Sequence, residues 1–269
     1  MKPKAFEYLR AKSVQEVVDA LAQHGDDARV IAGGQSLVPM MNFRIAAPEL
    51  LIDIRHVPEL NEIRINGDYV EVGAAVTQNR LLAWAELQAR LPLLAASMPW
   101  VGHFQTRNRG TVCGSLAHAD PSSEIPLSLA MLEGEVVLAS KSGTRTLKAS
   151  EFQLGMLTTA KESDELITAA RFPIHGGKKV AFREVARRHG DFAMVAVGAM
   201  EAGANEILLG IGGVAGSPVV HRFNKSASVL SEIESLLPTL DINDDIHADA
   251  DMRQDILRRL APAVVAELN

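Results

Sequence analysis

The sequence predicts an α+β protein made of three small units, and three patterns support this interpretation. Residues 1–57 alternate a helical pattern with short buried strands, and residues 58–174 contain a strong hairpin signal. Residues 175–269 hold apolar runs separated by turn residues, as in an antiparallel sheet. With 269 residues, of which 47% are hydrophobic and 22% charged, the chain can bury a core in two or three compact units.

The first unit is predicted to contain one helix and two strands. Ser13 and Glu16 fit a capping box, and the apolar residues that follow at helical spacing form one face before a stop at Gly25. Residues 29–31 and 50–54 are typical of short buried strands. The first of these strands leads directly into a glycine-bearing segment.

The middle unit is predicted to begin with a hairpin. Two strands within residues 62–76 are joined by Asn66 and Gly67, a dipeptide typical of two-residue turns. Further predicted elements are a helix over residues 124–132 and strands over residues 135–138 and 166–172.

A single helix is expected to begin at Thr77 and to run past Leu87, until it is broken near Pro92. Residues 100–121, by contrast, show little periodicity and are rich in Gly, Asn, Thr and His. An irregular stretch of this length inside a compact domain is usually functional. We therefore expect residues 100–121 to contribute to a ligand site.

The last unit is predicted to follow a linker at residues 173–178 and to hold an antiparallel sheet. Its apolar runs cover residues 180–185, 193–200 and 207–211. Residues 249–268 repeat apolar positions at helical spacing, which predicts a helix with a kink at Pro262. The carboxylates around residues 241–245 are expected in a solvated loop.

Two patterns resemble functional motifs but lack the required context. Residues 210–215 match a dinucleotide fingerprint, which works only where a helix follows at once. Residues 217–220 are typical of a strand instead, so we interpret the glycines as a turn and exclude a Rossmann domain. His118 and Asp120 are spaced like metal ligands, but no further donors lie nearby, so no metal site is predicted.

Charge and hydropathy exclude several classes of protein. A net charge of −6 and a pI of about 5.8 argue against a nucleic-acid partner, which needs a basic face. No apolar run reaches the length of a membrane span, and the first residues lack the apolar core of a signal peptide. We therefore expect a cytoplasmic protein without a membrane span.

The single cysteine limits the redox chemistry that the chain can perform. One thiol cannot hold an iron–sulfur cluster, so a redox role has to rest on an organic cofactor, with any metal centre on another polypeptide. Cys113 itself is expected to pack as a small apolar residue behind its loop, and a reactive thiol is the alternative.

Two glycine-bearing segments give the strongest indication of function. Residues 32–36 and 111–115 both contain glycine and both end in a serine hydroxyl. Small residues let backbone N–H groups approach a ligand closely, and such groups in a turn form a site for anionic oxygens. One such site suits a phosphate, and two suit the pyrophosphate of a dinucleotide.

The chain resembles the FAD-binding medium subunits of molybdenum hydroxylases, such as carbon monoxide dehydrogenase and bacterial xanthine dehydrogenase. The resemblance spans nearly the whole chain and is carried, in order, by AGGQSLVPMM (32–41), RNRGTVCGSLAHADPSSEIP (107–126), ELITAARFP (165–173) and GDFAMVAVGA (190–199). It implies an FAD-binding fold of the vanillyl-alcohol-oxidase or PCMH type. Its two subdomains would be residues 1–57 and 58–174, and residues 175–269 would form the C-terminal domain of the CO dehydrogenase flavoprotein type.

The resemblance also implies which residues contact FAD. The two glycine-bearing segments would bind the pyrophosphate, with His118 nearby; Glu124 and the backbone of Ile167 would contact the adenosine portion, and Val101, Arg183 and Phe192 would line the flavin end. The full set is Ile31, Ala32, Gly33, Gly34, Gln35, Ser36, Val101, Thr111, Gly114, Ser115, His118, Glu124, Ile167, Arg183 and Phe192. Two positions depart from the family, which commonly has glycine at Cys113 and often tyrosine at Phe192. No residue is identified as a substrate acid–base catalyst.

The function implied is electron transfer within a larger enzyme. Substrate would be oxidised at molybdopterin on a large subunit, and electrons would pass through the [2Fe–2S] clusters of a small subunit to FAD on this chain and then to an external acceptor. The expected assembly is a dimer of heterotrimers. Two alternatives stay open: a self-sufficient FAD-dependent oxidoreductase, and a non-redox module that binds a nucleotide or another diphosphate.

Overall fold

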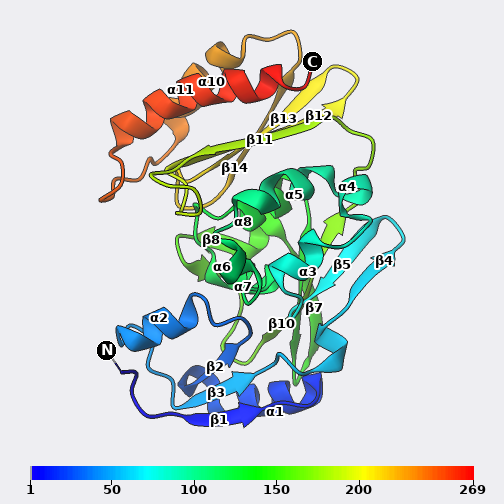
Figure 1. Ribbon diagram of the computed structural model, residues 1–269, viewed down its shortest axis with the longest axis vertical. Coiled ribbons are helices and arrows are strands. Elements are labelled where there is room, and N and C mark those ends of the chain that lie inside the picture. The colour runs from blue at the N-terminus through cyan, green and yellow to red at the C-terminus, as the bar shows by residue number, and fades with distance from the viewer. Residues whose placement is uncertain (1) are drawn as a thin grey trace.

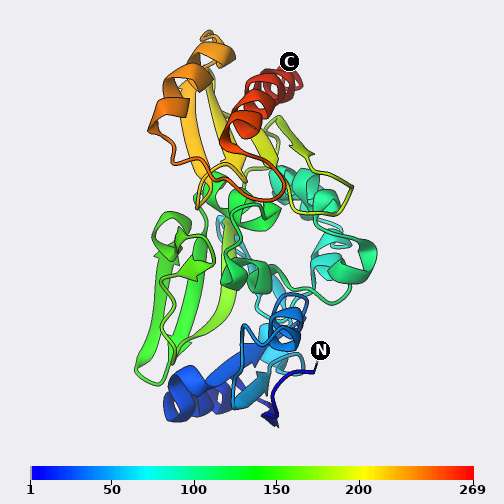
Figure 2. The same ribbon diagram turned by 90° about the vertical axis from the view of Figure 1, so that its left-hand side faces the viewer.

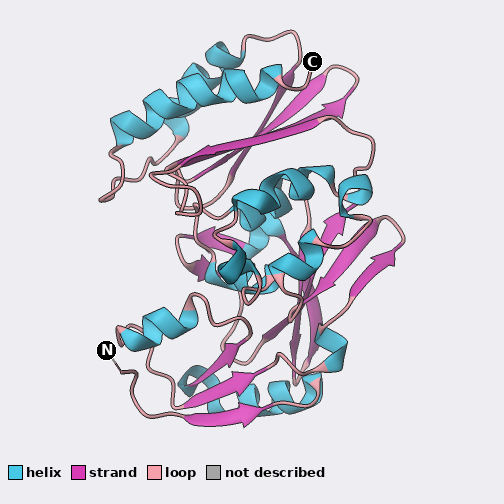
Figure 3. Ribbon diagram, viewed as in Figure 1, coloured by secondary structure: helices cyan, strands magenta, loops and turns pink. Residues whose placement is uncertain are grey.

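Three units follow one another along the long axis of the molecule in the computed structural model, which describes residues 2–269 (Figure 1). The N-terminal unit lies at one end, and the C-terminal unit lies at the other. Each unit combines a sheet with helices (Figure 3), so the α+β class predicted from the sequence is confirmed. The chain connects the last two units between Pro173 and Val180, within the predicted linker region.

The N-terminal unit is a three-stranded parallel sheet in the order β1–β3–β2. Its strands are β1 (Glu7–Arg10), β2 (Ala28–Ile31) and β3 (Leu50–Asp53), and its helices are α1 (Val14–His24) and α2 (Leu37–Asn42). As predicted, Ser13 caps α1, because its Oγ accepts a hydrogen bond from the Glu16 N–H. The Glu16 carboxylate accepts from the Lys12 N–H, so the reciprocal bond of a capping box is shifted by one residue.

Strand β1 was not predicted, and long-range side-chain contacts fix it at the sheet edge. The Tyr8 hydroxyl donates to Asp53, which is fully buried and forms an ion pair with Arg55 at 2.6 Å. Burial acts to raise the pKa of Asp53, but hydrogen bonds from Arg55 and Tyr8 outweigh it and lower this pKa to about 2. These contacts couple residues far apart in sequence, which local patterns do not reveal.

The middle unit is a five-stranded antiparallel sheet in the order β4–β5–β10–β6–β7. Its strands are β4 (Ile63–Asn66), β5 (Tyr69–Gly73), β6 (Glu135–Ser140), β7 (Gly143–Lys148) and β10 (Leu166–Pro173); the short pair β8 (Gln153–Gly155) and β9 (Thr158–Thr159) lies outside this sheet. The predicted hairpin forms, but its turn is one residue later than predicted: Asn66 ends β4 and pairs with Tyr69, so the two turn residues are Gly67, with a φ of 60°, and Asp68.

The prediction of a single helix after Thr77 is wrong, because three short helices form there. Thr77 caps α3 (Gln78–Leu82), but the chain then turns and forms α4 (Leu87–Arg90) and α5 (Pro92–Ser97). Leu81 and Leu87 are both buried, although about 120° separates them around a straight helix at roughly 100° per residue. Breaking the helix lets both side chains enter the core.

The prediction of irregular structure over residues 100–121 is also wrong in part, because two short helices form there. This stretch contains α6 (Phe104–Arg107) and α7 (Val112–His118), both shorter than the window in which helical periodicity becomes visible. Thr111 caps α7, because its Oγ1 accepts from the Gly114 N–H at 3.0 Å. The second glycine-bearing segment is therefore the start of a helix and not a turn.

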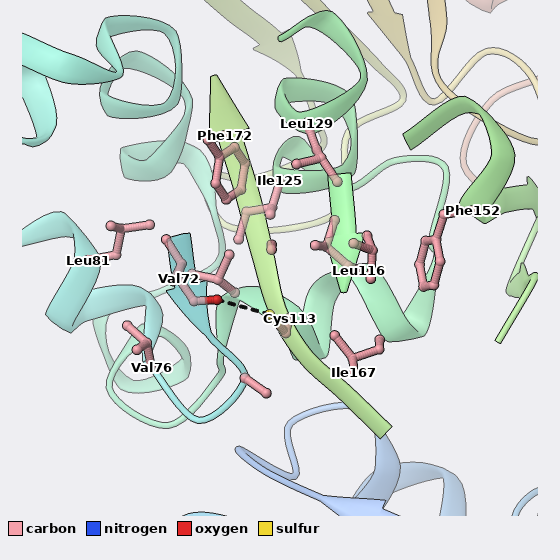
Figure 4. Packing of buried hydrophobic residues seen from close by; sticks show 14 of the residues in the cluster. Val72, Val76, Leu81, Cys113, Leu116, Ile125, Leu129, Phe152, Ile167 and Phe172 are labelled. Atoms are coloured by element: carbon pink, nitrogen blue, oxygen red, sulfur yellow. Dashed lines mark hydrogen bonds between the residues drawn. The ribbon is translucent and has the colours of Figure 1, made fainter. Parts of the chain in front are cut away.

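Cys113 lies in the large hydrophobic core, to which all three units contribute (Figure 4), and it is packed there as predicted. It is 2% exposed, and its thiol lies 3.6 Å from the carbonyl oxygen of Val72. Burial raises the pKa of this thiol to about 12, which disfavours the reactive thiolate. Around it pack the side chains of α7 and of the helices α8 (Glu124–Met131) and α9 (Ala149–Phe152).

The C-terminal unit is an antiparallel sheet in the order β11–β12–β13–β14, and two helices cover one of its faces (Figure 2). Its elements are β11 (Val180–Val185), β12 (Val195–Gly203), β13 (Glu206–Gly212), β14 (Val219–Asn224), α10 (Val229–Leu236) and α11 (Ala250–Ala266). Val195 and Val197 face these helices, whereas Ala196 and Met200 join the core of the middle unit. The sheet is therefore buried on both sides.

Two further predictions about this unit have different outcomes. Residues 210–212 end strand β13 and β14 follows, so the exclusion of a Rossmann helix at this point is confirmed. Asp245, by contrast, is not merely a solvated loop residue, because its Oδ2 lies 2.6 Å from Nη2 of the buried Arg253. The predicted C-terminal helix forms, and it continues through Pro262.

Candidate functional site

A cavity of about 890 Å³ lies where the three units meet. Its volume is in the upper part of the range of roughly 300–1,000 Å³ that is usual for ligand pockets. The lining comes from the loop after β2, from α7 and the segments around it, and from the loop before β12. No single unit could form this site alone.

The first glycine-bearing segment lines the cavity with free backbone donors. Within residues 2–269, the N–H groups of residues 33–36 donate to no backbone carbonyl. Gly34 has a φ of 71°, a conformation that favours glycine, and the Gln35 side chain donates back to the carbonyl of Gly33 at 3.1 Å. Four successive N–H groups without backbone acceptors among residues 2–269 suit the binding of an anion.

Gly33 has a further role that the sequence did not indicate. A Cβ at this position would lie 2.1 Å from the carbonyl oxygen of Arg109 and 2.7 Å from Cα of Gly110. The first glycine-bearing segment therefore packs backbone against backbone on residues 109–110, which lead directly into the second. Glycine is needed here for this contact, in addition to any contact with a ligand.

The second segment is anchored from behind by the chain around Thr77. The Gln78 N–H donates to the carbonyl of Gly110 at 2.8 Å, and the Val112 N–H donates to that of Val76 at 3.2 Å. Gly114 leaves room for the cap, because a Cβ there would lie 2.7 Å from Thr111 Oγ1. Helix α7 thus begins at a fixed place in the cavity wall.

Glu124, the first residue of α8, is a buried carboxyl group in the cavity lining. It is 6% exposed. Burial, the largest effect, raises the pKa of Glu124 to about 7; its own N–H acts in the opposite direction, and the charge of Asp120 raises the pKa further. This group consequently changes charge near neutral pH, which ordinary glutamates do not.

The structure brings together all but one of the predicted site residues. Those that line the cavity are Ile31, Ala32, Gly33, Gly34, Gln35, Ser36, Val101, Thr111, Gly114, Ser115, His118, Glu124, Ile167 and Phe192. Arg183 does not line it and forms an ion pair with Glu267 at 2.9 Å. Side chains alternate along β11, so Phe182 faces the middle unit while Arg183 points to the other side.

Several polar residues of the lining were not predicted, and Gln78 and Lys161 are two of them. Gln78 is 6% exposed, and its Oε1 is enclosed without a hydrogen-bond partner among residues 2–269. Lys161 donates to the carbonyls of Glu162 at 2.6 Å and Glu165 at 3.1 Å, and burial lowers the pKa of its ammonium group. No motif marks either position, because each reaches the cavity only through the tertiary fold.

Residues 2–269 contain neither a candidate metal site nor a helix that could span a membrane. No group of three or more His, Cys, Asp or Glu side chains there is arranged to hold a metal ion. In that same part of the chain, every helix is too short or too polar to cross a bilayer.

Comparisons with known proteins agree with this geometry. Residues 4–175 match the family described as the FAD binding domain in molybdopterin dehydrogenase. The chain is 41% identical over 195 residues to subunit alpha of the 6-hydroxypseudooxynicotine dehydrogenase complex of Paenarthrobacter nicotinovorans. This alignment covers 72% of this chain and 66% of the relative. It is 33% identical to the nicotine 6-hydroxylase medium subunit of the same organism, over 99% of this chain and 98% of the relative.

A solved structure extends the similarity over the whole fold. The carbon monoxide dehydrogenase from Hydrogenophaga pseudoflava that lacks the Mo-pyranopterin moiety of its cofactor contains a chain with a TM-score of 0.93 and 34% identity. The match covers 100% of this chain and 98% of that one. This protein therefore belongs to the family of FAD-binding domains of molybdopterin dehydrogenases, and the predicted flavoprotein fold is confirmed.

Proposed function

We propose that this chain is the electron-transfer subunit of a molybdenum hydroxylase and that it holds FAD in the cavity between its three units. The observation that carries the proposal is the pairing of residues 32–36 with the start of α7 in one cavity of about 890 Å³. Unpaired backbone donors, a buried carboxyl group at Glu124 and the Gln78 amide, whose Oε1 has no partner among residues 2–269, give this cavity the polar groups that a dinucleotide requires.

The backbone of residues 33–36 donates to the pyrophosphate, and the hydroxyl groups of Ser36 and Ser115 add hydrogen bonds from either segment. Glu124 and the backbone of Ile167 hold the adenosine portion. Val101 and Phe192 line the flavin end, where Phe192, which is 57% exposed, shields one face of the ring system.

Bound FAD supplies the chemistry of accepting single electrons and releasing a pair. The residues of this chain bind and orient the cofactor, and none of them is assigned a proton transfer to or from a substrate. We propose that electrons arrive from [2Fe–2S] clusters on a small subunit, that substrate is oxidised at molybdopterin on a large subunit, and that the external acceptor takes the electrons from this chain. Support comes from the relatives, which are named as subunits or medium chains of dehydrogenases and hydroxylases.

Release of the cofactor tests the assignment of the site. The purified chain is denatured by acid, and the supernatant is separated by chromatography against FAD and FMN standards. We expect one FAD per chain in the supernatant. Recovery of FMN, of a colourless nucleotide, or of flavin that stays on the precipitated protein would overturn the proposal.

A further inference from the structure

Arg253 is a buried arginine in the C-terminal unit, remote in sequence from every residue assigned to the cofactor site. It lies in the first turn of α11 and is 2% exposed. Its Nη1 donates to the carbonyl of Met194 at 2.6 Å and also to the carbonyl of Gly213. Its Nη2 lies 2.6 Å from Asp245 Oδ2, which balances the buried charge.

The two carbonyl groups belong to segments that lead into the cavity wall. Met194 follows Phe192, which lines the cavity, and the Met194 N–H is fixed by the carbonyl of Val185 at 2.8 Å. Gly213 donates its N–H to the carbonyl of Pro121 at 2.8 Å, and Pro121 stands three residues before Glu124.

The two segments are also in direct contact. Gly213 has a φ of 79°, and a Cβ there would lie 2.7 Å from the carbonyl oxygen of Met194 and 2.8 Å from that of Ala193. The carbonyl oxygens of Met194 and Gly213 both accept from Nη1 of Arg253, so they lie close together around one nitrogen, where their negative ends repel each other. A guanidinium group donating to both offsets this repulsion with charge-assisted hydrogen bonds.

We propose that Arg253 is a positioning residue of the cofactor site: from the C-terminal unit, it sets the position of Phe192 through Met194 and that of the segment before Glu124 through Gly213. The inference rests on the proposed function, because it assigns Phe192 to the flavin ring. Arginine suits this role because its fork of donors reaches two carbonyls and a carboxylate at once, which the single ammonium group of lysine does not.

The test compares three variants of the full chain loaded with FAD. Arg253→Met removes the donors but keeps much of the side-chain volume, and Arg253→Lys restores charge with a different geometry. Arg258→Met is the matched control on the same helix, because within residues 2–269 the Arg258 side chain pairs only with Glu234, Asp255 and Gln254, near or at the surface. Visible circular dichroism of the bound flavin and the rate at which oxygen reoxidises the dithionite-reduced flavin are measured.

We expect Arg253→Met to change the flavin dichroism, to speed reoxidation and to weaken FAD binding about tenfold, the equivalent of roughly 1.4 kcal/mol. Arg253→Lys should recover part of each change, and Arg258→Met should match the wild type. If Arg253→Met lowers only the melting temperature while dichroism and reoxidation stay at wild-type values, Arg253 has a purely structural role and the inference is wrong.

A second variant keeps the inference testable if Arg253→Met does not fold. Asp245→Asn leaves the arginine in place but removes its ionic partner, and it should shift the same two flavin signals in the same direction by less. Unchanged signals in this variant would overturn the inference. A wild-type chain without FAD would instead overturn the proposed function.

Discussion

At the scale of single residues, two carboxyl groups at or near the cavity have pKa values well above the ordinary value of glutamate. Glu124 is buried in the cavity lining, and Glu184 on β11 lies close enough for their charges to interact. Burial, followed by the charge of Glu124, raises the pKa of Glu184 to about 8. The two carboxyl groups therefore disfavour each other's ionisation near the site proposed for an anionic cofactor.

The raised pKa of Glu124 predicts a pH dependence of the free energy of unfolding. The pKa of Glu124 rises from its ordinary value of 4.5 to about 7 in the folded chain. Between these two pH values the folded state therefore binds more protons than the unfolded state. Stability from this group is thus present at low pH and is lost as the pH rises through that window. Glu124→Gln should be as stable as the wild type near pH 4 and more stable at pH 8, by about 1–3 kcal/mol.

Urea unfolding of the FAD-free chain at both pH values measures this difference, and exposed Glu59→Gln serves as the control. A stability difference between Glu124→Gln and wild type that is the same at both pH values would contradict the raised pKa.

Gln78 predicts opposite effects on stability and on cofactor binding. Its enclosed Oε1 has no partner among residues 2–269, and such a group costs about 1–3 kcal/mol. Gln78→Met removes that cost at similar volume, so the FAD-free chain should melt at a higher temperature. FAD should bind more weakly, because the cavity loses an amide.

Thermal melts and fluorescence titration with FAD measure the two effects of Gln78→Met. Gln105→Met, at an exposed glutamine on α6, is the control. Equal FAD affinity in Gln78→Met and wild type would show that the amide does not contact the cofactor.

At the scale of elements, strands and turns could be predicted from the sequence wherever a local signal exists. Gly67 favours the hairpin turn through its positive φ, and Ser13 and Thr77 cap the starts of helices, because each acts on neighbours within a few residues. The two glycine-bearing segments were found for the same reason. Helices as short as α6 and α7 carry too few residues to show a period.

Features set by tertiary contact could not be predicted. The direction of Arg183 depends on the register of β11 against β12, and the resemblance alone placed this residue at the flavin end. The cavity position of Gln78 depends on the bonds that join its backbone to Gly110. In each case the deciding partner is distant in sequence, so no local pattern reports it.

The packing of the first glycine-bearing segment on residues 109–110 predicts that Gly33 is intolerant of even a methyl group. In Gly33→Ala the new Cβ would overlap the carbonyl of Arg109 at 2.1 Å, so the segments have to separate. We expect a loss of about 1–3 kcal/mol in stability, the usual cost of overpacking, together with loss of FAD.

Gly155→Ala is the matched control for Gly33→Ala, because a Cβ at Gly155 would meet nothing within 4 Å. Both variants are compared with wild type by urea unfolding and by flavin absorbance after purification. Full flavin content in Gly33→Ala would show that the segments can move apart without affecting the site.

At the scale of the whole molecule, the proposed function predicts partners. One cysteine cannot hold an iron–sulfur cluster, so under the proposed function the clusters that supply electrons to FAD would lie on another subunit. Native purification should recover the chain with a small [2Fe–2S] subunit and a large molybdopterin subunit, at the mass of a dimer of heterotrimers. Metal analysis should find both molybdenum and iron. Isolation of this chain alone, with full dehydrogenase activity and neither metal, would contradict the assignment.

Because Cys113 is buried and is the single cysteine of the chain, the rate at which its thiol is labelled can report how often the cavity opens. Cys113 is 2% exposed and belongs to the cavity lining, so a labelling reagent reaches its thiol when the structure opens locally, and the labelling rate measures these openings. If opening requires release of FAD, a concentration of cofactor 100 times its dissociation constant stabilises the closed form by about 2.7 kcal/mol and slows labelling about 100-fold. Labelling at the same rate with and without FAD would mean that the thiol is reached by a route that leaves the cofactor in place.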